Sequence, residues 1–214
     1  MFFTLLYADD CDDYSLKYIN QSVLERISAS DPTLIEFDFS GRRSAPSTIK
    51  ALAKALEHNT TLRSLELCDT EIQSDLKDIA EALKVNQSLK SLSLAKNRFK
   101  SKDIKNLAEA LKVNETLISL DLSENQIDED SILAFIETLE KNTTLIELYG
   151  IEDNRVQFYL ERNRKLRPLH NSSYWQNSAS LWYSDPHIQT VCCGLAFHSS
   201  YNFAQYLGYA KVTN

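Results

Sequence analysis

The sequence lacks the signals that would place the chain in or across a membrane. No apolar run approaches the ~20 residues that a helix needs to span a bilayer. The first residues, MFFTLLYADDCDD, show no basic segment followed by a long apolar run, as a secretory signal would. The four cysteines, at positions 11, 68, 192 and 193, form no C-x-x-C pair and no disulfide-framework spacing. These absences are typical of a reducing compartment and predict a cytoplasmic protein.

Positive charge and catalytic motifs are also scarce. The chain has 23 Lys and Arg against 30 Asp and Glu, for a net charge of −7 at pH 7. Because nucleic-acid binding depends on clustered Lys and Arg, no nucleic acid is expected as a ligand, and a basic protein partner fits better. There is no G-x-S-x-G nucleophile elbow, and no histidine converges on the carboxylates. We therefore expect no enzyme activity, no cofactor and no metal site.

The sequence does contain an internal repeat. Its clearest unit is TLISLDLSEN at 116–125, in which Leu117, Leu120 and Leu122 have the spacing L-x-x-L-x-L and Asn125 follows. Copies of this pattern begin at Leu34, Leu62, Leu89, Leu117 and Leu145. The first copy is looser, with Phe37 and Phe39, and the last is incomplete after Leu148. Consecutive units are 27 or 28 residues apart. A fixed period of this length predicts a solenoid, in which stacked units share one core.

Each unit has two halves with different periodicity. The leucine-containing half alternates apolar and polar residues, as a half-buried strand does, and the second half carries an apolar stripe with helical spacing. The prediction is an α/β leucine-rich-repeat solenoid, a horseshoe with parallel strands on its concave face and helices on its convex face. The expected domains are an N-terminal helical cap at 1–30, repeats with a terminal capping helix at 31–168, and an aromatic-rich, nearly uncharged tail at 169–214.

The repeats resemble a known class of protein. The motifs ALKVNQSLKSLSLAKN, ALKVNETLISLDLSEN and LEKNTTLIELYG are similar to the ribonuclease-inhibitor-like leucine-rich repeats, and VQFYLERNRKLR looks like the helix that closes such domains. That class includes tropomodulin-like actin-binding domains, innate immune sensors, GTPase-activating proteins and effectors of intracellular bacteria. The resemblance covers residues 31–168 and implies protein–protein interaction.

Two sets of asparagines have predicted structural roles. Asn97 and Asn125 lie where the chain leaves a strand, so we expect their amides to bond backbone groups that no strand partner satisfies. Four others lie in N-x-S/T sequences just after predicted helices: Asn59, Asn86, Asn114 and Asn142. We interpret these four as helix caps in the left-handed conformation rather than as glycosylation acceptors.

The candidate binding site consists of strand positions between the leucines, which would face the concave side. These positions are Glu36, Asp38, Ser64, Glu66, Ser91, Ser93, Ser119, Asp121, Glu147 and Tyr149. They include five carboxylates and no Lys or Arg, which favours a basic partner surface. Tyr149 and the nearby Ile151 would add an apolar anchor. The alternative is that these residues are polar only for solubility.

Three further regions leave alternatives open. The tail at 169–214 has nine aromatics and two charges, and three alternatives are open for it: it packs on the last repeat, it contacts a partner or membrane, or it is poorly ordered. Basic clusters at 96–105 and 162–167 are either solvated charge or contacts for anionic lipid. Arg42 and Arg43, in the turn after the first strand, could stabilise phosphoryl charge on a bound GTPase, although only their position suggests this and a solvated basic turn is the favoured interpretation.

The leading hypothesis is a monomeric, non-enzymatic protein-interaction module that binds through its acidic concave face. One biological setting for it is a bacterial effector translocated into a host cell and acting on host proteins. The alternatives are a regulator of another enzyme, of GTPase-activating or inhibitor type, and a tropomodulin-like actin regulator.

Overall fold

The computed structural model describes residues 21–42, 46–72 and 76–170. The described residues up to Asn163 belong to one compact unit, which contains all five strands of the structure's sheet. Of a second unit, residues 164–214, only the end of the last helix is described. The predicted tail, most of the predicted N-terminal cap and Arg43 therefore lie outside the described residues.

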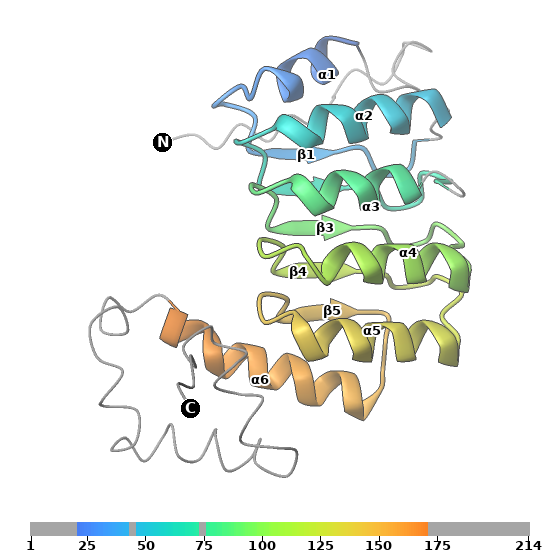
Figure 1. The fold of residues 1–214 in the computed structure, drawn as a ribbon. Coiled ribbons are helices and arrows are strands. Elements are labelled where there is room, and N and C mark those ends of the chain that lie inside the picture. The colour runs from blue at the N-terminus through green and yellow to red at the C-terminus, as the bar shows by residue number, and fades with distance from the viewer. Residues whose placement is uncertain (1–20, 43–45, 73–75, 171–214) are drawn as a thin grey trace, which may run out of the picture. The chain divides into compact units, whose positions relative to one another are not determined.

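Strands and helices alternate along the chain. The strands are β1 (Glu36–Asp38), β2 (Ser64–Glu66), β3 (Ser91–Ser93), β4 (Ser119–Asp121) and β5 (Glu147–Tyr149). The helices are α1 (Gln21–Ser28), α2 (Pro46–His58), α3 (Leu76–Val85), α4 (Ser101–Leu111), α5 (Glu129–Lys141) and α6 (Asn154–His170). All five strands pair in parallel in chain order, and Figure 1 shows α2 to α5 stacked on one side of the sheet. The predicted leucine-rich-repeat solenoid is confirmed.

The register of the sheet follows from the repeat. Leu65, Leu92, Leu120 and Leu148 are aligned across neighbouring strands, and each is 5% exposed or less. Helical residues such as Leu52 also reach the core between sheet and helices. Because one strand and one helix cannot cover their own apolar sides, each unit depends on its neighbours for burial.

The four asparagines of the N-x-S/T sequences form a ladder along the helix ends. The Nδ2 of each donates to a backbone carbonyl of the preceding unit: Asn59 to Ile27 at 2.7 Å, Asn86 to Leu56 at 2.7 Å, Asn114 to Leu83 at 2.7 Å and Asn142 to Leu111 at 2.8 Å. The same side chains accept N–H bonds from the residues two and three places later, for example Ser88 and Leu89 on Asn86.

This ladder corrects the sequence interpretation of these asparagines. None of the four has a positive φ, and Asn142 is extended, with φ −75° and ψ 123°. They are therefore not left-handed caps, and their side chains rather than their backbone conformation explain why asparagine recurs. All four are 5% exposed or less, which is incompatible with glycosylation of the folded chain.

Asn97 and Asn125 form a second ladder at the opposite ends of the strands, as predicted. Asn97 Nδ2 donates to the carbonyl of Leu67 at 2.7 Å, and its Oδ1 accepts from the backbone N–H of Thr70 at 3.1 Å. Asn125 Oδ1 accepts from the N–H of Asn97 at 3.0 Å. Side-chain amides thus satisfy buried backbone groups at both ends of the strands.

The last unit departs from the repeat at Gly150. The residue has φ +87°, and a Cβ there would lie 2.6 Å from the backbone carbon of Leu122. Only glycine fits this close approach. The following helix, α6, then buries Val156 and Leu160 completely.

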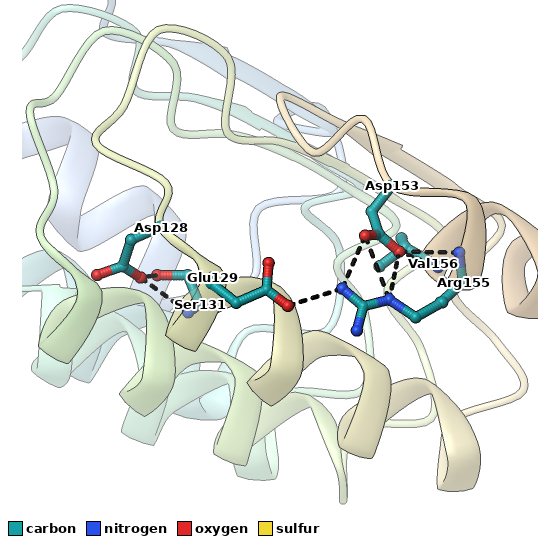
Figure 2. A network of polar contacts seen from close by, with 6 residues as sticks. All are labelled: Asp128, Glu129, Ser131, Asp153, Arg155 and Val156. Carbon is teal, nitrogen blue, oxygen red and sulfur yellow. Dashed lines mark hydrogen bonds and ion pairs between the residues drawn. The ribbon is translucent and has the colours of Figure 1, made fainter.

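Polar contacts join the starts of the last two helices (Figure 2). Asp128 begins α5 by accepting the N–H of Ser131 at 2.9 Å. Arg155, in the first turn of α6, bonds Asp153 at 2.9 Å and Glu129 of α5 at 2.8 Å. The guanidinium therefore links two consecutive units, and Asp153 also accepts the backbone N–H of Arg155 at 2.8 Å.

Candidate functional site

The strand residues that point away from the core form two rows across the sheet. We call the ten predicted site residues together the open face. Its first row is Glu36, Ser64, Ser91, Ser119 and Glu147, and its second row is Asp38, Glu66, Ser93, Asp121 and Tyr149. Neighbours within a row lie about 4.8 Å apart, the spacing of paired strands. The structure thus brings the predicted residues together on one surface.

Most of the open face is accessible, with two corrections to the sequence hypothesis. Glu36 and Asp38 are exposed and Tyr149 is 52% exposed. Ser93, however, is only 8% exposed and contributes little surface. Ile151 is 2% exposed because it follows the tight turn at Gly150 and enters the core, so it is not an anchor beside Tyr149.

Negative charge accumulates around Glu66 on β2. Burial raises the pKa of Glu66 above its ordinary value, and the charges of Asp38, Asp121 and Glu36 raise it further, while a hydrogen bond with Ser93 opposes the shift. The half-buried carboxylate is thus surrounded by charges of its own sign, which disfavours its ionised form.

The two aspartates of the second row are held in place by local hydrogen bonds. Asp38 Oδ1 accepts the backbone N–H of Ser40 at 2.8 Å, and Asp121 Oδ1 accepts that of Ser123 at 2.8 Å. Each bond joins residues two apart in an Asp-x-Ser sequence, a local motif that the sequence analysis did not use. The carboxylates at these two positions are therefore preoriented.

The other candidate residues take different places. The Arg42 guanidinium carbon lies 5.7 Å from the centre of the Phe39 ring. Within the described ranges, no group of three His, Cys, Asp or Glu residues is arranged to hold a metal ion. Burial raises the pKa of the Cys68 thiol, which discourages its ionisation.

Several side chains of the basic clusters at 96–105 and 162–167 form contacts within the fold. Lys96 pairs with Glu124 at 3.2 Å, and Lys105 pairs with Asp130 at 2.7 Å. Arg162 donates to the carbonyl oxygen of Leu139 at the end of α5 at 2.6 Å. This contact gives Arg162 a structural role at the end of α5.

No helix among the described residues has both the length and the apolar character needed to cross a membrane.

The fold and the open face define a leucine-rich-repeat solenoid with one helix in each unit. Residues 69–161 match the family model of the TMOD/LMOD leucine-rich domain. A solved structure of the leiomodin-1 actin-binding site 2 (ABS2) is similar, with 27% identity and a TM-score of 0.67. The similarity covers 73% of this chain and 96% of the leiomodin-1 chain.

A second solved structure, the tropomodulin C-terminal domain of Caenorhabditis elegans, is similar in fold. It has 20% identity and a TM-score of 0.64, and the match covers 70% of this chain and 95% of that one. No curated protein matches the sequence.

Proposed function

We propose that this protein is a non-enzymatic actin-binding protein, whose leucine-rich repeats bind actin as a regulator of the tropomodulin and leiomodin type. The observation that carries this proposal is the similarity to leiomodin-1 actin-binding site 2, which extends over nearly the whole of that domain. The match of residues 69–161 to the TMOD/LMOD leucine-rich domain supports it independently. An actin-binding role also implies a cytoplasmic location.

The same comparisons favour this hypothesis over the bacterial effector. Both solved structures belong to the actin-regulator class, and neither supports an origin in a bacterium or translocation into a host cell. The more general interpretation, a protein-interaction module, is common to both hypotheses. The tropomodulin-like alternative therefore becomes the main one.

The architecture suits binding without catalysis. Two asparagine ladders and a continuous core fix neighbouring units against each other, so surface residues are held on a rigid support. A preformed surface loses little conformational entropy when a partner binds.

The test is binding of the full-length protein to actin. Co-sedimentation with filaments, fluorescence anisotropy with labelled monomeric actin and a pointed-end elongation assay would be run beside the leiomodin-1 domain as a positive control. We expect saturable binding in at least one assay. A Leu92→Asp variant, which places a charge in the core, should lose it. Binding by leiomodin-1 but not by this protein would contradict the proposal.

A further inference from the structure

The acids of the open face differ from several other acids of the unit in having no cationic partner among the described residues. Carboxylates elsewhere pair with Lys or Arg, as Asp31 does with Arg26 and Asp130 with Lys105. No carboxylate of the open face forms an ion pair with any residue in 21–42, 46–72 or 76–170. Like charges on adjacent strands repel, so a cationic partner would gain affinity by relieving this repulsion.

The preoriented aspartates set a distance that this partner must match. Asp38 on β1 and Asp121 on β4 are separated by three strand spacings, or about 14 Å. In an extended peptide, residues i and i+4 point to the same side and are also about 14 Å apart. In a helix, residues i and i+4 are only about 6 Å apart along the axis.

The side chains between and beside these aspartates also fit an extended segment. Glu66 lies next to Asp38, and the small, largely buried Ser93 lets a backbone approach closely between Glu66 and Asp121. Tyr149 follows Asp121 at the end of the row, and its half-exposed ring can stack on an apolar stem or a cation.

We infer that the open face is a docking site for an extended basic segment of a protein partner, with Lys or Arg at alternate positions. The segment crosses the strands from β1 to β4, places cations against Asp38, Glu66 and Asp121, and ends beside Tyr149. The inference rests on the proposed protein-binding function and adds to it the chemistry of the partner.

The test uses the full-length protein and two fluorescein-labelled peptides of equal composition. In Ser-Lys-Ser-Lys-Ser-Lys-Ser the lysines alternate, and in Ser-Ser-Lys-Lys-Lys-Ser-Ser they are contiguous. Fluorescence anisotropy at about 50 mM salt, where surface charge is weakly screened, measures both affinities. We expect the alternating peptide to bind at least about fivefold more tightly, because all three of its lysines share one side, whereas the contiguous peptide has only two lysines on any one side. Equal affinities, or no measurable binding of the alternating peptide, would overturn the inference.

Neutral variants locate the binding. The triple variant Asp38→Asn, Glu66→Gln and Asp121→Asn removes three charges but keeps the acceptors for Ser40 and Ser123. The control, Glu57→Gln, Glu115→Gln and Glu137→Gln, removes as many charges elsewhere. With both folds verified by circular dichroism, we expect the first variant to lose at least about tenfold in affinity for the alternating peptide and the control less than about twofold. Equal losses would overturn the inference.

The two proposals fail in different assays. If the wild-type protein binds the alternating peptide but not actin, the proposed actin function is wrong and the docking site is supported. A protein that binds actin but does not distinguish the two peptides overturns the docking site alone.

Discussion

The side-chain amide of Asn97 donates a 2.7 Å hydrogen bond to the backbone carbonyl of Leu67, one repeat earlier in the chain. Its oxygen accepts the backbone N–H groups of Thr70 at 3.1 Å and of Ile72 at 3.3 Å. One buried side chain thus satisfies three polar groups of the preceding unit and fixes the relative position of the two units. Cooperation between units is the basis of the predictions that follow.

Replacing Asn86 by alanine should destabilise the fold by about 3 kcal/mol. The change leaves the carbonyl of Leu56 and the N–H groups of Ser88 and Leu89 without these bonds in a buried place, and each buried unsatisfied group costs about 1–3 kcal/mol. Urea denaturation followed by circular dichroism measures the loss. The neighbouring, exposed Gln87→Ala should change stability by less than about 0.5 kcal/mol. Similar effects of the two changes would mean that the ladder is dispensable.

Alanine at Gly150 should cost more than alanine at Gly41. Both glycines have positive φ, so each change incurs the cost of about 1–2 kcal/mol for a left-handed residue with a Cβ. At Gly41 the new Cβ meets nothing within 4 Å, whereas at Gly150 it meets the backbone of Leu122 at 2.6 Å. We expect an additional loss of about 1–3 kcal/mol at Gly150, as in overpacked cores, measured by urea denaturation of both variants. Equal losses would show that the turn at Gly150 opens without cost.

Truncating a leucine of the sheet should be far more costly than truncating an exposed one. Leu92 is 1% exposed at the centre of the sheet, and its replacement by alanine should lower the free energy of unfolding by about 2–5 kcal/mol. Leu133, which is 43% exposed on α5, should lose less than about 1 kcal/mol on the same change. Chemical denaturation compares them, and a small effect at Leu92 would be inconsistent with a core shared between units.

The ion pair of Arg155 should be visible in the titration of Asp153. Hydrogen bonds from the Arg155 side chain are the main cause that lowers the pKa of Asp153 to about 2. In Arg155→Ala we expect this pKa to rise toward the ordinary value of about 3.9, measured by NMR of the carboxyl carbon. The control Arg98→Ala, at an exposed arginine on another turn, should leave it unchanged.

The lowered pKa also sets the direction of a pH effect on stability. A carboxyl group whose pKa is lower in the folded state stabilises the protein above pH about 4, and this contribution disappears as the pH falls toward about 2. Thermal unfolding of Arg155→Ala should therefore lose less stability over this interval than the wild type. An identical acid dependence in both proteins would show that the pair does not contribute.

Much of the fold could be predicted because each of the five repeats must bury its apolar residues against its neighbours in the same way. The alternation around Leu92 and Leu120 predicts the strands and their parallel alignment, since only in-register stacking buries every leucine. The bonding of Asn97 was predictable from its place after a strand. The ladder of Asn86 was not, because an asparagine just after a helix also fits a left-handed cap, and only the stacked units bring the carbonyl of Leu56 to its amide.

For the candidate site, strand periodicity was enough to show which residues share the open face and that they carry five carboxylates, because a period of two assigns side chains to faces. Which of them reach solvent depends on tertiary packing. Ile151 follows Tyr149 at the same period of two, but the left-handed turn at Gly150, packed against Leu122, directs it into the core. The like charges around Glu66 also come from two other strands, β1 and β4, so only the paired sheet brings them together.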